Sequence, residues 1–374
     1  MKNKSPYANH SKIHDINIEG IISDINNLAS KINNRKINIM EVCGTHTMAI
    51  AKNSLRQLLP SNINLISGPG CPVCVTPVSD IDWILGIINN YKVAVFTFGD
   101  MIRVPGSSSS LMLEKSTGKD ITICYSPSDA LDFAEKNPDK NIIFIAIGFE
   151  TTIPLTAVII KRAIEKNLKN FFIFCIHKII PPALDLLMLD KNIKIDGLLL
   201  PGHVSAIIGM KPYEFIPEKY NTPCVISGFE PIDILSSINM ILKQIESSNL
   251  KVEIEYKRVV KEEGNPFAVQ EIYDVFEPED SIWRGLGAIA GSGLKIKDKY
   301  SKIDAKIKFL VDKIDSKEPV GCECGNVLKG IKNPFECKYF AKSCTPDKPI
   351  GPCMVSSEGT CAAYFKYERH KIKK

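Results

Sequence analysis

The sequence predicts an α/β protein built on parallel sheets, and three observations lead to this fold class. Eight short apolar runs between residues 37 and 229 are continuous rather than alternating in polarity, as in parallel strands buried on both faces. Amphipathic segments separate many of these runs, so that strand and helix alternate along the chain. From about residue 249 the pattern changes, and a cysteine-rich segment follows.

The predicted elements fall into four ranges. Residues 1–35 form an N-terminal helical segment, with its helix at 18–32. The first lobe, 36–125, has strands at 37–43, 63–68, 93–99 and 121–126, and a helix at 80–90. The second lobe, 126–248, has strands at 142–149, 171–177, 197–202 and 223–229, and helices at 128–137, 154–167 and 232–246.

The fourth range, 249–374, is predicted to be a smaller C-terminal α+β domain. Its residues 251–260 and 271–280 have the pattern of antiparallel strands, whereas residues 281–304 are glycine-rich and are expected to form a loop. Weak internal similarity, such as "CGTHT" and "GFETT" after two strands, indicates that the two lobes are related. We therefore expect two Rossmann-like lobes facing a cleft, plus the C-terminal domain.

Composition limits the location and partners of the chain. The net charge of +5 is mild and its clearest concentration is the tail 366–374, so no nucleic-acid partner is expected. The first residues lack an apolar core, and no apolar run approaches 18 residues, which predicts neither a signal peptide nor a membrane span. We expect a cytoplasmic protein whose twelve cysteines serve metal or redox chemistry rather than a disulfide framework.

Polar side chains follow several of the predicted strands. In an open parallel sheet, ligands bind beyond the carboxyl ends of the strands. If the two lobes face each other, one cleft collects the side chains that follow these strands: Cys43, Thr45, His46, Cys71, Cys74, Glu150, Thr151 and His203.

The stretch "GPGCPVC" places Cys71 and Cys74 at the start of a predicted helix. Free backbone N–H groups and the helix dipole favour a thiolate there. The spacing suits a reversible disulfide or a shared metal ion. No second Cys-x-x-Cys exists for a zinc clip, and the terminal Gly-Lys-Ser/Thr of a phosphate loop is absent. An ordinary turn with two cysteines is the remaining alternative.

Three further residues have both a chemical and a structural interpretation. Cys43 lies three residues before His46, so the imidazole is placed to assist its thiolate, but a buried cysteine at a strand end has the same pattern. His203 fits a ligand or a helix cap. Glu150 fits a site acid or a side chain held at a helix start by the dipole.

The C-terminal segment concentrates soft metal ligands. Six thiols lie within 40 residues with no histidine among them: Cys322, Cys324, Cys337, Cys344, Cys353 and Cys361. Thiolates select zinc or iron–sulfur clusters, and the paired knuckles of a zinc ribbon are missing. A [4Fe-4S] cluster with four scattered ligands fits best, and two thiols remain to exchange electrons as a disulfide.

These motifs together resemble the HypD family of [NiFe]-hydrogenase maturation factors. The resemblance rests on five motifs in order: "CGTHT", "GPGCPVC", "GFETT", "PGHVS" and "CTPDKPIGPCMVSSEGTCAAYF". It extends from about Lys36 to Tyr367, and no motif departs from the family pattern.

The resemblance implies a scaffold that holds Fe(II) while two cyanides and one carbon monoxide are attached. It implies a HypC-type chaperone, a HypE-type cyanide donor and, indirectly, the hydrogenase large subunit as partners. By motif match Cys43 would anchor the iron, Cys71 and Cys74 would relay electrons or contact metal, and His46 and Glu150 would lie close to the iron.

The preferred cluster ligands are Cys322, Cys337, Cys344 and Cys361, which leave Cys324 and Cys353 as the free pair. On the sequence alone Cys322 and Cys324 are interchangeable. Two other functions stay open at this stage, a [4Fe-4S]-dependent protein disulfide reductase and a non-redox zinc-binding interaction protein.

Overall fold

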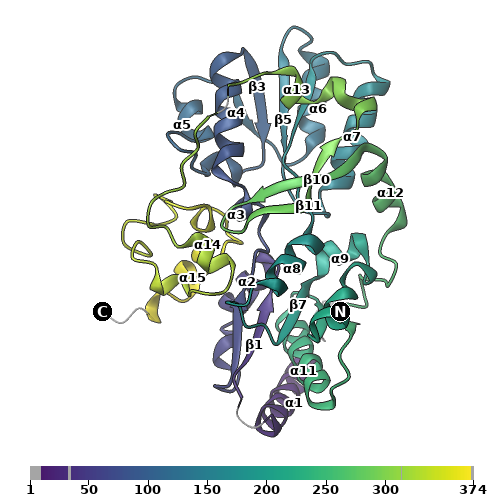
Figure 1. Ribbon diagram of the computed structural model, residues 1–374, viewed down its shortest axis with the longest axis vertical. Helices are drawn as coiled ribbons and strands as arrows, with labels where there is room; N and C mark the ends of the chain where they lie inside the picture. The colour runs from purple at the N-terminus through teal and green to yellow at the C-terminus, as the bar shows by residue number, and fades with distance from the viewer. Residues whose placement is uncertain (1–9, 33–34, 313, 372–374) are drawn as a thin grey trace, which may run out of the picture.

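Two parallel sheets form two lobes, one above the other, and the cysteine-rich segment lies beside their junction (Figure 1). The computed structural model describes residues 10–32, 35–312 and 314–371, with the backbone alone for 10–17 and 371. The sequence predictions for the first nine and last three residues lie outside the described residues.

Both sheets are entirely parallel, as the sequence predicts. Sheet A, in the lower lobe of Figure 1, has the order β2 (Ile63–Ser67), β1 (Ile37–Glu41), β7 (Gly197–Pro201), β8 (Cys224–Ser227), β9 (Val252–Ile254). Sheet B, in the upper lobe, has the order β4 (Ile121–Ile123), β3 (Val93–Thr97), β5 (Asn141–Ala146), β6 (Phe171–Cys175).

The sheets do not follow the predicted consecutive lobes, 36–125 and 126–248. Sheet A combines strands from 37–67 with strands from 197–254, whereas sheet B takes all its strands from 93–175. The sequence shows which segments are strands, but a continuous apolar run carries no signal for its pairing partner. The chain therefore passes between the lobes three times, after β2, after β6 and again after β9, where Asp304 pairs with Ile173 of β6.

Helices bury both faces of each sheet, which explains the uninterrupted apolar strands. On sheet A, the outer core is formed with α1 (His10–Lys31), α2 (Gly44–Lys52) and α11 (Pro231–Ser247). On sheet B, the outer core is formed with α6 (Pro127–Lys136) and α7 (Ile153–Glu165). The inner faces of both sheets share one large core with α4 (Val78–Asn90) and α8 (Ile180–Leu189).

The chain after residue 249 differs from the prediction in two elements. Residues 252–254 form the parallel edge strand β9 of sheet A, not an antiparallel strand of a third domain. After α12 (Pro266–Val275), the strands β10 (Phe276–Trp283) and β11 (Gly287–Ile296) form an antiparallel hairpin that crosses between the lobes (Figure 1). The glycine-rich stretch predicted as a loop is largely β11.

The glycines of β11 have a physical reason. The Cα of Gly293 faces Ser281 so closely that a Cβ there would lie 2.6 Å from the Ser281 Cβ. The register also shifts between Glu279 and Ser281. Glycine in a strand commonly marks such a close approach or a bulge. Because glycine is also typical of loops, the sequence predicted a loop here.

The cysteine-rich segment consists of short helices and turns around α14 (Cys324–Leu328) and α15 (Thr360–Tyr367). The remaining α-helices are α3 (Pro72–Val75), α5 (Leu111–Ser116), α9 (Gly202–Ile208), α10 (Phe215–Tyr220) and α13 (Ala305–Lys308). Within the described residues every helix is too short or too polar to cross a bilayer.

Candidate functional site

The sheet topology creates a switch point in each lobe. In sheet A the chain runs from β1 outward to β2, and after its return it runs from β7 in the opposite direction to β8 and β9. In sheet B the same reversal occurs between β3 and β5. Ligands of open parallel sheets bind at such points, beyond the strand ends. Cys43 follows β1, His203 follows β7 and Gly148 follows β5.

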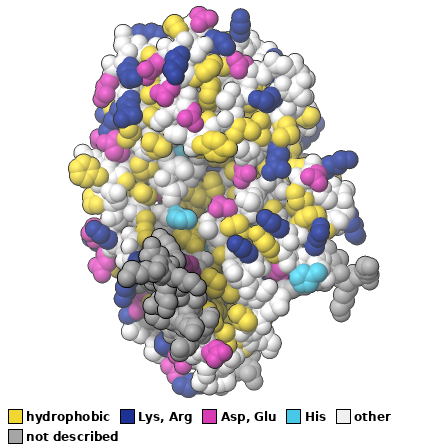
Figure 2. All heavy atoms as spheres, turned by 180° about the vertical axis from the view of Figure 1, so that it is seen from behind, with side chains coloured by type: hydrophobic (Ala, Val, Ile, Leu, Met, Phe, Trp, Pro, Cys, Tyr) yellow, Lys and Arg dark blue, Asp and Glu magenta, His cyan; other side chains and the backbone are white. Residues whose placement is uncertain are grey.

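A cleft of about 390 Å³ lies at these strand ends. Its wall comes from both lobes and from the cysteine-rich segment, and includes Val42, Cys43, Thr45, Gly70, Pro72, Gly148, Phe149, Thr151, Thr152, Pro201, His203, Val204, Ala206 and Glu358. Apolar side chains also gather in a band across the middle of the molecule, at the level where the lobes meet (Figure 2).

The predicted site residues divide into two groups. Cys43, Thr45, Thr151 and His203 line the cleft. The side chains of His46, Cys71, Cys74 and Glu150 are not part of this lining and are buried behind it. The sequence therefore brings the right segments together, but it does not tell which side chains face the open space.

Cys43 stands at the beginning of α2 with its sulfur over the helix end. The side chain caps none of the backbone N–H groups of α2, although the nearby N–H groups of Thr45 and His46 favour the thiolate. Burial, with the nearby Glu358 carboxylate as a second cause, nevertheless raises the pKa of the Cys43 thiol to about 12. A metal ligand must be a thiolate, so a cation that binds Cys43 displaces its proton.

The "GPGCPVC" loop lies directly against Cys43. Gly44 N donates to Gly70 O at 3.0 Å. A Cβ on Gly70 would lie 2.2 Å from the Cys43 backbone nitrogen, so only glycine permits this approach. Glu358 closes the other side, where Thr45 Oγ1 donates to Glu358 Oε1 at 2.7 Å.

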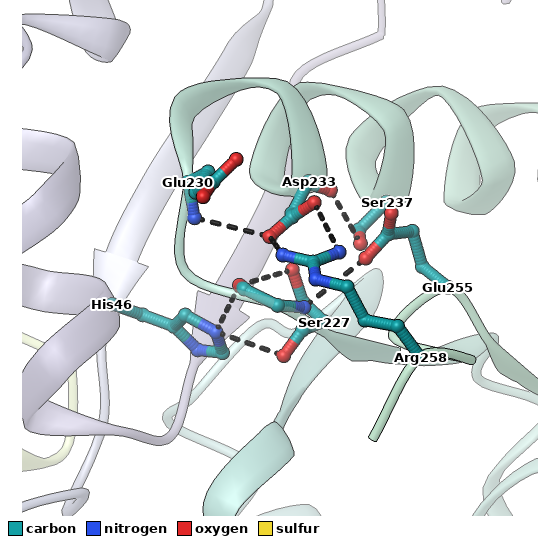
Figure 3. A network of polar contacts seen from close by, with 8 residues as sticks. His46, Ser227, Glu230, Asp233, Ser237, Glu255 and Arg258 are labelled. Atoms are coloured by element: carbon teal, nitrogen blue, oxygen red, sulfur yellow. Dashed lines mark hydrogen bonds and ion pairs between the residues drawn. The ribbon is translucent and has the colours of Figure 1, made fainter. Parts of the chain in front are cut away.

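His46 has a fixed tautomer. Its Nε2 lies 2.9 Å from Gly228 O and 3.3 Å from Ser227 O, and since both are acceptors this nitrogen bears the hydrogen (Figure 3). Nδ1 is buried without a hydrogen-bond partner. Burial lowers the pKa of His46 to about 4, so the ring is neutral at neutral pH and Nδ1 keeps a free lone pair.

Two buried carboxyl groups support the site from below. Glu41 accepts from Cys43 N at 3.3 Å and from Thr47 Oγ1 at 2.6 Å. Glu150 accepts from Ile180 N at 2.9 Å through Oε1, while its Oε2 has no partner. Burial raises the pKa of each carboxyl to about 7.

Cys71 and Cys74 form a close thiol pair. Their sulfurs are 2.6 Å apart, and Cys71 Sγ accepts from Cys74 N at 3.3 Å where α3 begins. Burial raises the pKa of both thiols. At Cys74 the neighbouring thiols of Cys353 and Cys71 oppose this effect and lower the pKa to about 6, whereas the pKa of Cys71 stays well above its usual value. Of the two thiols, Cys74 loses its proton more easily.

The six C-terminal cysteines line a single cavity. Within it Cys324 Sγ and Cys353 Sγ are 2.7 Å apart. The residue before Cys353, Pro352, lies beside the first pair, since its carbonyl oxygen is 3.9 Å from Cys74 Sγ. Among the described residues no three His, Cys, Asp or Glu side chains are arranged as a site for a metal ion. The soft, all-thiol donor set nevertheless has the chemistry that an iron–sulfur cluster requires.

Three residues of the site were missed from the sequence. Glu358 lies within the last quoted motif, and Glu41 directly precedes "VCGTHT", so motif membership was the available signal for both. Phe229 stacks on His46 and on His203, with ring centroids 4.8 and 4.0 Å away. It follows β8 in "VISGFE", where nothing in the sequence marks an aromatic platform.

Comparisons with known proteins identify the family of the chain. Residues 17–368 match the family described as "HypD: Hydrogenase formation hypA family". The chain belongs to the HypD family.

Its relatives carry the same description. Hydrogenase maturation factor HypD2 of Bradyrhizobium diazoefficiens is 45% identical over 340 residues, which cover 89% of this chain and 90% of the relative. Hydrogenase maturation factor HypD of Rhodobacter capsulatus is 44% identical, covering 93% and 95%. That of Cupriavidus necator is 42% identical, covering 90% and 91%. Membership of the HypD family makes this chain a hydrogenase maturation factor.

Proposed function

We propose that this HypD-family chain is a redox-active scaffold that holds iron at Cys43 while cyanide and carbon monoxide are attached. Fe(II) carrying these ligands is the cargo, and a soft thiolate is a suitable holding ligand for it. Cys43 suits this role because it is the cysteine that lines the interlobe cleft, with His46 and Glu150 directly behind the wall.

One observation carries the redox part of the proposal, a series of neighbouring cysteines. Cys71 touches Cys74, Cys74 Sγ lies 3.9 Å from the carbonyl oxygen of Pro352 directly before Cys353, and Cys353 touches Cys324. The series begins in the loop packed against Cys43 and ends in the cavity of the six C-terminal cysteines. This arrangement of neighbouring cysteines between two sites supports a role in electron transfer rather than in packing alone.

The series permits balanced two-electron exchange. When Cys71 and Cys74 become a disulfide, they give two electrons and two protons to the precursor that is reduced on the iron. Cys353 then loses its proton and attacks Cys74 Sγ, a mixed disulfide forms, and Cys71 leaves and takes up the proton. Cys324 attacks Cys353 in turn, which frees Cys74 and leaves the Cys324–Cys353 disulfide. Each exchange breaks one S–S bond and forms another.

The Cys324–Cys353 contact also favours one ligand set for the [4Fe-4S] cluster. With these two thiols paired, the four other cysteines of the cavity remain as ligands: Cys322, Cys337, Cys344 and Cys361. When bound, the cluster supplies electrons one at a time.

The partners follow from the same proposal. A HypC-type chaperone shares the iron, a HypE-type protein donates cyanide, and the hydrogenase large subunit receives the finished group. The reaction belongs in the cytoplasm, where thiols stay reduced. It requires neither nucleic acid nor a membrane.

Infrared spectroscopy tests the iron-holding role. The anaerobic protein, co-purified with its small chaperone, is expected to show cyanide and carbon monoxide stretches, and Cys43→Ala is expected to lose them. Cys224→Ala is the matched control, since Cys224 is another buried free thiol of sheet A outside the cleft. Bands that persist in Cys43→Ala, or their absence from the wild-type complex, would refute the scaffold.

The two alternatives have their own tests. A protein disulfide reductase would use the Cys71–Cys74 pair and would keep full maturation activity after Cys43→Ala. A zinc-binding interaction protein would contain near-stoichiometric zinc and no acid-labile sulfide after anaerobic purification.

A further inference from the structure

A short loop after β8, residues Ser227–Phe229, connects the two histidines of the site. His46 donates to the carbonyl oxygens of Ser227 and Gly228, and its ring stacks on Phe229. His203 stacks on the same phenyl ring. The positions of both imidazoles therefore depend on where this loop lies.

The loop is held from behind by charged residues. The buried carboxylate of Asp233 accepts from the Glu230 backbone N–H at 3.1 Å, directly after the loop. The two terminal nitrogens of the Arg258 guanidinium donate hydrogen bonds to Asp233 Oδ1 and Oδ2, at 2.9 and 2.5 Å (Figure 3). Glu255 Oε2 accepts from Gly228 N at 3.1 Å.

Two glycines show how tightly the loop is enclosed. A Cβ on Gly228 would lie 2.2 Å from Asp233 Oδ2, so the carboxylate presses directly on the loop backbone. A Cβ on Gly202, the residue before His203, would lie 2.5 Å from Ser227 O. The loop thus has no free space on the side of Asp233 or on the side of α9.

We infer that the Arg258–Asp233 ion pair is a positioning device for the iron site, which holds the Ser227–Phe229 loop and through it fixes the His46 tautomer and the His203 ring. The inference rests on the proposed function in one respect, that His46 serves the iron held at Cys43. Arg258 is not part of the cleft lining, and half of its side chain is exposed to solvent.

The geometry explains why arginine serves here. A bidentate guanidinium fixes the orientation of a carboxylate, which a lysine ammonium does not. Only an Asp233 carboxylate held in this orientation keeps one oxygen on Glu230 N and the loop in register. A rotated loop would move Gly228 O away from Nε2, and the hydrogen would then distribute between the two ring nitrogens.

The test measures the ring directly in the full chain, labelled with 15N-histidine. The spectrum of wild type is expected to show His46, assigned through His46→Gln, as a single tautomer with a hydrogen on Nε2. In Arg258→Gln the two ring-nitrogen signals of His46 are expected to shift toward each other as the tautomers mix. Arg258→Lys keeps the positive charge but cannot donate from two fixed nitrogens. Its His46 signals are expected to lie between those of wild type and Arg258→Gln.

Arg35→Gln is the matched control. Arg35 is also half exposed and pairs with a buried partner of the same sheet, Asp196, at 3.2 Å, but Asp196 holds Asn38 at the opposite end of β1. This variant is expected to leave the His46 signals unchanged. His203 and Asp233 are the titratable groups that act on the His46 ring, so all spectra are compared at one pH.

The second measurement is the infrared band intensity of the chaperone complex. Positioning residues behind a metal ligand typically contribute ten- to a hundredfold. The band intensity is expected to fall about tenfold or more in Arg258→Gln and to recover in part in Arg258→Lys. Arg35→Gln is expected to keep the band intensity of wild type. Unchanged His46 signals in folded Arg258→Gln, or an equal effect in Arg35→Gln, would overturn the inference. Missing bands in wild type would refute the proposed function alone, because the 15N spectra still decide the inference.

Discussion

At the scale of single residues, the site combines a buried thiol with buried neutral groups. Burial raises the pKa of the Cys43 thiol and of the Glu41 and Glu150 carboxyls, and lowers that of His46. All four shifts favour the uncharged form of the group. A cation that arrives with its ligands meets several protons that it can displace.

Glu150 gives a prediction about pH. Its pKa rises from 4.5 in the unfolded chain to about 7 in the fold, so the folded state binds more protons between these values and its stability falls as pH rises through this window. Glu150→Gln is expected to flatten this fall by up to about 1.4 kcal/mol per pH unit. Part of the fall in stability remains in this variant, because the pKa of Glu41 is also raised to about 7.

Urea unfolding at a series of pH values between 4.5 and 8 measures this difference. Glu165→Gln, at the exposed end of α7, is the control and is expected to follow wild type. A Glu150→Gln curve parallel to that of wild type would mean that the carboxyl titrates as it does in water.

The residue types were easier to predict than their orientations. Cys43, Thr151 and His203 were expected at a cleft and line it, because each follows a parallel strand. His46 and Glu150 come from the same motifs but are buried behind the wall. Adjacent residues in a turn or helix point in different directions, and a motif does not show which of them faces the cleft.

At the scale of elements, the eight predicted parallel strands and the main helices are present, because apolar period and length identify them well. The strand β11 was the main miss, whereas residues 276–280 of β10 were predicted as an antiparallel strand. Gly293 serves close contact with Ser281 on the neighbouring strand rather than a loop, and this contact depends on how the two strands pair. Local pattern alone does not contain that information.

The hairpin gives a second prediction. Gly293→Ala would place a Cβ 2.6 Å from the Ser281 Cβ across the hairpin. Such overpacking is expected to lower the free energy of unfolding by about 1–3 kcal/mol. Gly99→Ala is the matched control, since its Cβ would meet only Ile123 at an ordinary 3.7 Å. Urea denaturation compares the two, and equal stabilities would show that the hairpin relaxes without cost.

At the scale of the whole molecule, the cysteine-rich segment joins both lobes through sulfur and through Glu358. Pro352 O lies 3.9 Å from Cys74 Sγ, and Arg103 from the sheet B side donates to Val355 O at 3.0 Å. The sequence did not show which strands form each lobe, because β1 pairs with β7 and all strands of sheet B lie between these two along the chain. Long-range pairing is decided by the packing of complete elements.

The sulfur series gives a third prediction at this scale. With the cluster in place and reduced, the Cys71–Cys74 disulfide is expected to open to the dithiol, and Cys353→Ser is expected to slow this by about tenfold or more because the exchange partner is lost. Alkylation followed by mass spectrometry measures the dithiol. Cys175→Ser, a buried thiol of sheet B, serves as control. Equal rates in Cys353→Ser and wild type would show that electrons take another route.

The strands of sheet B lie, along the chain, between two groups of sheet A strands, and this order has a consequence for synthesis on the ribosome. All four strands of sheet B lie within residues 93–175, so this sheet is complete while the chain is still growing. The central pair of sheet A forms only after Gly197–Pro201 has emerged, since Ile39 pairs with Gly197. The nascent protein thus carries Cys43 without its cleft until β7 has emerged, and the thiol becomes enclosed only when the chain returns to the strand with which it began.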